Sequence, residues 1–187
     1  MAFSMFGRTI RKIGVIGSGN IGPDIALHLS QNLQSYGVPV VVVDILQAAL
    51  DSGQKKAESK ILKAVEKKAL KKDEADAVFA NIRFSTDYGQ LSDADFVIEA
   101  AFERTDVKHK IFAQCQEVCP KTAIFASNSS HMVPEKIFKN MEPHGQARGP
   151  HKPYPPTPLG AEALRCAGAK ASVGHPPVSE IRRSMVK

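Results

Sequence analysis

The sequence predicts an α/β fold: a doubly wound, Rossmann-type parallel sheet with a helical insertion after its second strand. Three observations support this prediction. Short apolar runs alternate with helical patterns over most of the first 140 residues, a glycine cluster follows the first run, and a carboxylate ends the second. Such alternation is typical of parallel sheets whose two faces are covered by helices.

The strands are expected in five apolar runs, at residues 13–16, 38–43, 82–85, 96–99 and 123–127. A helical pattern follows the glycine cluster and extends to Leu33. The insertion after the second strand is a Lys- and Ala-rich helix over 47–72, long for a crossover, and a shorter helix over 73–79. A last helix is expected over 106–119, between the fourth and fifth strands.

The glycine cluster has the pattern G-x-G-x-x-G between a strand and a helix, and comprises Gly17, Ser18, Gly19, Asn20, Ile21 and Gly22. In this pattern the first glycine permits a tight turn, the second lets a pyrophosphate approach, and the third lets helix pack on strand. The free amides at the start of the helix then bind phosphates. A strand-turn-helix without a ligand is the alternative.

Asp44 ends the second strand, 22 residues after Gly22. A carboxylate there can accept hydrogen bonds from the adenosine ribose hydroxyls, and its charge would repel a 2′-phosphate. The predicted cofactor is therefore NAD rather than NADP. A helix-capping role for Asp44 is the alternative.

Composition excludes several other classes of protein. The chain has 187 residues, of which 43% are apolar, which suits one domain, and its longest apolar run is too short to cross a membrane. Most of the net charge of +6 falls in residues 144–187 without interleaved aromatics, so no nucleic-acid partner is expected. Three cysteines and no secretory signal suggest the cytoplasm, and the spacing of Cys115 and Cys119 suits a buried helical pair rather than a metal site.

The sequence divides at about residue 142. Eight of the twelve prolines lie from Pro143 onward, where they disfavour helices and inner strands. We expect a nucleotide-binding domain over 1–142 and an irregular, Pro-rich tail over 143–187.

Several segments together resemble the 3-hydroxyacyl-CoA dehydrogenases over roughly residues 10–140, the nucleotide-binding domain of that family. They are residues 12–16 before the glycine cluster, residues 95–103, Lys108, and residues 125–130. The resemblance implies NAD-dependent oxidation of a 3-hydroxyacyl-CoA to the 3-oxoacyl-CoA, as in fatty-acid β-oxidation, with an acyl-CoA as substrate.

The resemblance also implies roles for individual residues. Glu103 and Lys108 match positions that contact the nicotinamide end of the cofactor, and Ser130 matches a serine that binds the substrate hydroxyl beside the nicotinamide. The alternatives are a surface ion pair for Glu103 and Lys108, and a strand-end cap for Ser130. Lys67 lies near a family lysine that meets the CoA phosphates. By charge alone, other lysines are equally plausible: Lys63, Lys68, Lys71 and Lys72.

His151 is the candidate for the family's catalytic histidine, 21 residues after Ser130, and Glu162 lies near the place of the carboxylate that orients it. The residues after His151 depart from the family's aromatic and Asn-Pro pattern. A histidine in a solvated loop is the alternative.

The resemblance implies that a complete enzyme continues with a helical domain, which closes the substrate cleft and forms a homodimer. This chain ends at Lys187 before such a domain, so we expect it to represent the nucleotide-binding portion, with a homodimer only where that domain is present. Two alternatives stay open: a non-catalytic module that binds NAD and CoA, and a dehydrogenase of another 3-hydroxy acid.

Overall fold

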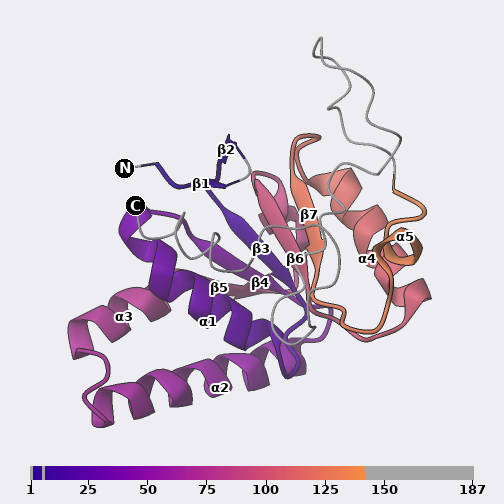
Figure 1. The fold of residues 1–187 in the computed structure, drawn as a ribbon. Helices are drawn as coiled ribbons and strands as arrows, with labels where there is room; N and C mark the ends of the chain where they lie inside the picture. The colour runs from indigo at the N-terminus through magenta and orange to yellow at the C-terminus, as the bar shows by residue number, and fades with distance from the viewer. Residues whose placement is uncertain (1, 6, 142–187) are drawn as a thin grey trace.

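A five-stranded parallel sheet forms the centre of the part of the chain described by the computed structural model, residues 2–5 and 7–141 (Figure 1). Its strand order is β5-β4-β3-β6-β7. The bounds are β3 (Ile13–Ile16), β4 (Val40–Val43), β5 (Ile82–Ser85), β6 (Phe96–Glu99) and β7 (Ile124–Ser127). All five predicted strands and the parallel, doubly wound arrangement are confirmed.

The first strand of the sheet, β3, lies at its centre, and this position fixes where a ligand can bind. The chain first builds outward through β4 and β5, then returns to place β6 on the other side of β3. Ile16 at the end of β3 pairs with Val43 on one side and Glu99 on the other, so the three strands end together. A crevice opens where neighbouring connections diverge, at the carboxyl ends of such strands.

Helices cover both faces of the sheet (Figure 1). Along β4, Val40 and Val42 belong to the core on one face, and Val41 and Val43 to the core on the other. The helices α1 (Gly22–Leu33), α2 (Gln47–Glu66) and α3 (Lys72–Ala80) pack on the first face, and α4 (Thr105–Val118) and α5 (Pro134–Ile137) on the second. The predicted helical insertion is therefore the pair α2 and α3.

The prediction of one helix over 47–72 is wrong, because α2 ends at Glu66 and α3 begins at Lys72. Lys68 has a φ of 56°, the left-handed conformation that ends many helices. The amides of the next two residues turn back onto the carbonyl of Ala64. The lysines expected on one continuous helix are thus divided between two helices and a turn.

A two-stranded antiparallel hairpin precedes the sheet and was not predicted. Its strands, β1 (Ser4–Met5) and β2 (Arg8–Thr9), have two residues each, too few to produce an alternating pattern. The connections also contain two short 3₁₀ helices, η1 (Gln34–Tyr36) and η2 (Tyr88–Leu91). The tail predicted over 143–187 lies outside the described residues, within which no helix is long and apolar enough to span a bilayer.

Candidate functional site

Residues 17–22, here called the glycine loop, connect β3 to α1 at the carboxyl edge of the sheet. Gly17 has a φ of 103°, and a Cβ there would lie 2.8 Å from the carbonyl oxygen of Ala100. A Cβ on Gly22 would lie 1.8 Å from the carbonyl oxygen of Gly17. These two positions therefore require glycine for the fold itself.

Gly19 differs from the other two glycines because a Cβ there would meet no atom of the described residues within 4 Å. The described residues around Gly19 do not require glycine at this position. A glycine is expected there if a ligand occupies the space beside it. Within residues 2–5 and 7–141, no acceptor binds the amides of Gly19, Asn20 and Ile21. Open space, free amides and the start of a twelve-residue helix together fit a diphosphate group.

Asp44 directly follows β4 and lies beside the glycine loop. One carboxylate oxygen accepts a hydrogen bond from the Ser18 amide at 2.7 Å, and the other from the Leu46 amide at 3.0 Å. Leu46 is the residue before α2, so Asp44 supports both the loop and the start of that helix. The carboxylate is half-buried and still has lone pairs for the hydroxyls of a ribose.

Helix α2 packs directly on the glycine loop, a contact that sequence reasoning missed. A Cβ on Gly53 would lie 2.2 Å from Ser18 Oγ, which is buried and has no hydrogen-bond partner among the residues that the structure describes. One turn later, the Lys56 ammonium donates to the carbonyl of Asn20. Lys60, another turn on, binds Asp24 in the first turn of α1 at 2.6 Å. Their spacing on one helical face was a usable sequence signal.

On the other side of β3, Glu99 ends β6 with a carboxylate that is fully buried. Both of its oxygens lie 2.7 Å from the Lys108 ammonium, which is only 1% exposed. Glu99 also accepts hydrogen bonds from Ser127 Oγ at 2.5 Å and the Ala101 amide at 2.7 Å. Four hydrogen bonds thus satisfy a charge that would otherwise be costly to bury.

The loops that follow β6 and β7 meet beside this carboxylate. Ser129 Oγ donates to Glu103 at 2.9 Å, and the Ser129 amide donates to Ser127 Oγ. The next residue, Ser130, is exposed, and its hydroxyl lies 2.5 Å from His131 Nδ1. The alternative of a surface ion pair for Glu103 and Lys108 is therefore wrong, because Glu103 accepts a hydrogen bond from Ser129 while Lys108 is buried on Glu99.

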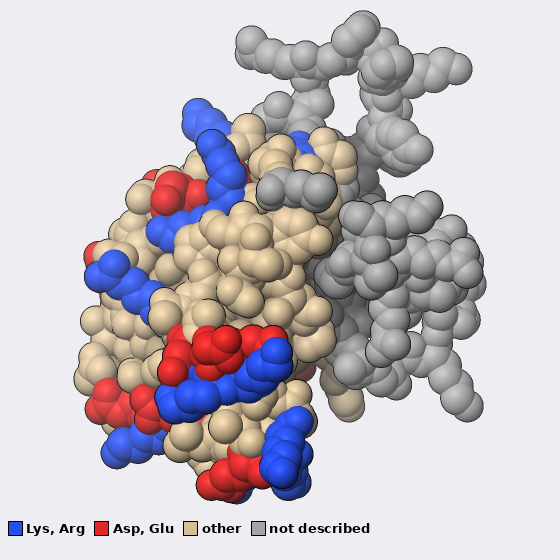
Figure 2. All heavy atoms as spheres, turned by 90° about the vertical axis from the view of Figure 1, so that its left-hand side faces the viewer, with Lys and Arg blue, Asp and Glu red and all other residues tan. Residues whose placement is uncertain are grey.

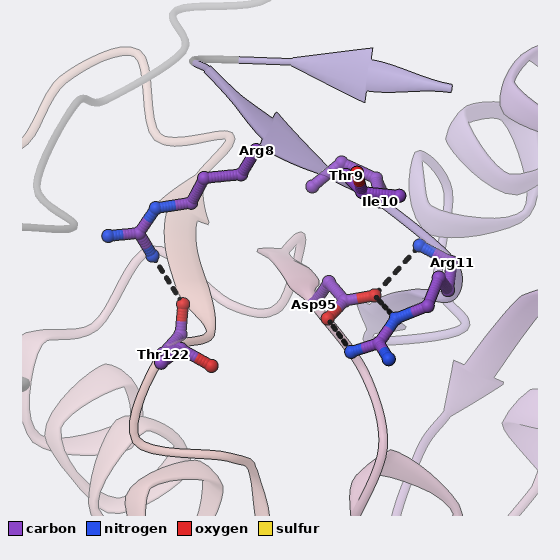
Figure 3. Close-up of a pocket in the computed structure, with 6 residues that line it drawn as sticks. All are labelled: Arg8, Thr9, Ile10, Arg11, Asp95 and Thr122. Carbon is purple, nitrogen blue, oxygen red and sulfur yellow. Dashed lines mark hydrogen bonds and ion pairs between the residues drawn. The ribbon is translucent and has the colours of Figure 1, made fainter. Parts of the chain in front are cut away.

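A separate hollow of about 460 Å³ opens at the opposite, amino edge of the sheet. It is lined by Arg8, Thr9, Ile10, Arg11, Asp95 and Thr122 (Figure 3). Arg11 forms two hydrogen bonds from its guanidinium to Asp95, and Arg8 donates to the carbonyl of Thr122. Its cations are already bound by protein acceptors, so the candidate site is the carboxyl edge.

Comparison with known families identifies the cofactor. Residues 12–159 match the family described as 3-hydroxyacyl-CoA dehydrogenase, NAD binding domain. The chain belongs to this family. Its cofactor is NAD, as the glycine loop and Asp44 predicted. The match extends beyond residue 142 and includes His151.

Relatives and solved structures agree with the family assignment. The chain is 30% identical, over 77% of its length, to the peroxisomal fatty acid beta-oxidation multifunctional protein MFP2 of Arabidopsis thaliana, covering 19% of that protein. It resembles the (S)-3-hydroxybutyryl-CoA dehydrogenase of Ralstonia eutropha, with a TM-score of 0.65 and 34% identity over 70% of this chain and 44% of that one. It also resembles the 3-hydroxybutyryl-CoA dehydrogenase of Escherichia coli, with a TM-score of 0.66 and 30% identity. That match covers 71% of this chain and 27% of the other. The chain thus spans less than half the length of these family members.

The predicted site residues fall into three groups in the structure. The glycine loop and Asp44 form one half of the carboxyl edge, and Glu103, Lys108 and Ser130 lie on the other half. Lys67 is exposed just past the last residue of α2, whose 20 residues span about 30 Å, and so is remote from the glycine loop. His151 and Glu162 lie outside the described residues.

Charges on the face at the left of Figure 1 are mixed rather than gathered by sign. Figure 2 shows basic and acidic side chains next to one another there. In helix α3, Lys72 and Asp76 form an ion pair at 2.5 Å. Neighbouring opposite charges compensate one another, so this face presents no extended field of one sign.

Proposed function

We propose that the chain is the nucleotide-binding part of an NAD-dependent 3-hydroxyacyl-CoA dehydrogenase acting in fatty-acid β-oxidation. The observation that carries the proposal is the glycine loop with free amides and open space at Gly19, with Asp44 at its side. The family assignment supports the reaction class. In this proposal residues 1–142 form the NAD-binding domain, and residues 143–187 a tail that carries the histidine.

In this proposal, residues on the two sides of β3 bind different parts of the cofactor. The amides of Gly19, Asn20 and Ile21 bind the diphosphate at the start of α1. Asp44, directly after β4, would bind the adenosine ribose. Glu103 and Ser130, in the loops that follow β6 and β7, would hold the nicotinamide half.

The chemistry requires removal of a proton from oxygen and a hydride from carbon 3 of the substrate. NAD, when bound, supplies the acceptor of the hydride. Ser130 is exposed at the end of the loop after β7 and donates its hydrogen bond to the substrate's 3-hydroxyl. His151 accepts the hydroxyl proton as the carbonyl forms, and Glu162 holds the imidazole in the required tautomer.

The substrate proposed is an acyl-CoA, and the basic turn after α2 is its expected contact. Lys67 lies in this turn, exposed and free to meet a CoA phosphate. By charge, the alternatives remain Lys63 in the last turn of α2, Lys68 and Lys71 between the two helices, and Lys72 at the start of α3. We propose a homodimer only for a chain that carries the family's helical domain, and a cytoplasmic location. Because one relative is a peroxisomal protein, the peroxisome is the alternative location to test.

Turnover is tested by following NADH absorbance with acetoacetyl-CoA as the substrate of the reverse reaction. The parent chain is expected to consume NADH, and His151→Ala to slow it by about 10²- to 10⁴-fold, the typical contribution of a general base. Ser130→Ala should also slow it, whereas His28→Ala, on the exposed surface of α1, should not. NADH binding without turnover would support the non-catalytic module instead.

A further inference from the structure

Glu99 is a buried charged group to which the proposed reaction gives no role. Its carboxylate is fully buried at the end of β6, on the half of the carboxyl edge away from Asp44. Both oxygens bind Lys108, and the remaining bonds come from Ser127 and the Ala101 amide. These donors belong to α4, to the end of β7 and to the loop after β6.

Stability alone does not account for this pair. Burying two charges carries a desolvation cost, and a well-packed apolar pair is often as stabilising or more so. The other inner strands end in apolar residues, Ile16 on β3 and Val43 on β4. A charged pair at the end of β6 therefore indicates a requirement for directed hydrogen bonds at that place.

Three residues are expected beside the nicotinamide: Glu103, Lys108 and Ser130. Lys108 is the ion-pair partner of Glu99, and the other hydrogen bonds of Glu99 lead to the loops that carry Glu103 and Ser130. Through the Ala101 amide, Glu99 fixes the loop that carries Glu103. Through Ser127 Oγ, which accepts from the Ser129 amide, it fixes the loop that carries Ser130. The bond from Ser129 Oγ to Glu103 joins the two loops and closes the network.

We propose that Glu99 is a positioning residue, whose carboxylate, fixed by Lys108, holds the loops after β6 and β7 in the arrangement that receives the nicotinamide half of NAD. This inference rests on the proposed function. Lys108 then acts through Glu99, since its ammonium is buried and already engaged with both carboxylate oxygens. The glycine loop and Asp44 lie outside the network, so the adenosine half should not depend on it.

The test compares NADH with ADP-ribose, which lacks the nicotinamide ring, in calorimetric titrations of the full chain. The double variant Glu99→Gln/Lys108→Met removes both charges and keeps an acceptor for the Ala101 amide. We expect NADH affinity to fall about tenfold, the scale of one lost hydrogen bond to a charged group, and ADP-ribose affinity to stay unchanged. Ser127→Ala, which removes no charge, should also lower the affinity for NADH relative to that for ADP-ribose.

A matched control uses another ion pair with more than one hydrogen bond, Arg11 with Asp95 at the amino edge of the sheet. Arg11→Gln removes the ion pair with Asp95 and should change neither affinity. The inference would be overturned if folded Glu99→Gln/Lys108→Met or folded Ser127→Ala lost the same affinity for both ligands. It would also be overturned if the ratio of NADH affinity to ADP-ribose affinity stayed as in the parent. A parent chain that binds neither ligand would contradict the proposed function first, and this inference with it.

Discussion

At the scale of single residues, the three glycines of the glycine loop have separable roles. Gly22→Ala would place a Cβ 1.8 Å from a backbone oxygen, whereas Gly19→Ala would place one in open space. We expect Gly22→Ala to lower the free energy of unfolding by about 3 kcal/mol, the cost of overpacking against backbone. Gly19→Ala should unfold like the parent but bind NADH more weakly.

Thermal unfolding and calorimetry with NADH check this pair of variants. The informative result is the contrast, with one variant losing stability and the other losing only binding. If Gly19→Ala binds NADH as tightly as the parent, the space beside Gly19 does not receive the diphosphate.

The carboxylate of Asp95 is expected to contribute to the free energy of unfolding in a way that depends on pH. Burial pulls the pKa of Asp95 upward, but the hydrogen bonds and charge of Arg11 outweigh it, so the pKa lies below its ordinary value. A lowered folded-state pKa stabilises the fold above the unfolded value of about 4, and this contribution is lost as pH falls through the folded pKa. Asp95→Asn should therefore be less stable than the parent near neutral pH.

Urea unfolding at pH 7 and at about pH 3 measures this difference, which should shrink as the carboxylate of the parent becomes protonated. Ser92→Ala, an uncharged change at an exposed position nearby, should show no comparable shrinkage. A gap between parent and Asp95→Asn that is constant over this range would contradict the role given to Arg11.

At the scale of elements, the contact of α2 with the glycine loop links the helical insertion to the cofactor site. Gly53→Ala would place a Cβ 2.2 Å from Ser18 Oγ and 2.7 Å from Pro23 Cγ. We expect α2 to shift from the loop, with a loss of about 1–3 kcal/mol in stability and weaker NADH binding. Ser52→Ala, exposed in the same turn of α2, is the control and should change neither. Equal stability and NADH affinity in Gly53→Ala and the parent would show that the contact is not tight.

The elements that sequence reasoning predicted well are those with a strong local pattern. Inner strands are continuous apolar runs, and the glycine cluster marks the turn into α1. The end of α2 had no such signal, because Lys68 adopts a left-handed conformation without being glycine or asparagine. The contacts of Glu99 were also missed, since its partners are brought together only by the packing of α4 and β7.

One signal for the buried ion pair was nevertheless present in the sequence. The buried face of α4 comprises Lys108, Ile111, Phe112 and Cys115, which follow the spacing of an amphipathic helix. A lysine on the apolar face of a helix requires a buried acidic partner. Glu99, at the end of β6, is the buried acid nearest to Lys108 in the sequence. The expected pair of Cys115 and Cys119 is confirmed as buried on this side of the sheet.

At the scale of the whole molecule, the sheet divides the candidate site into two halves that meet at β3. The half with the glycine loop and Asp44 holds its residues through backbone geometry and direct contacts. The half with Ser130 depends on side-chain hydrogen bonds around Glu99. This division explains why sequence motifs predicted the residues of the first half, whereas those of the second were predicted only through the family resemblance.

The central claim is that the glycine loop and Asp44 bind NAD, and calorimetric titration of the full chain with NADH tests it most directly. We expect saturable binding of one NADH per chain, weakened by about 1–3 kcal/mol in Asp44→Ala through the loss of a hydrogen bond to a charged group. Absence of any binding heat on folded protein at millimolar NADH, or equal affinity in the parent and Asp44→Ala, would contradict it.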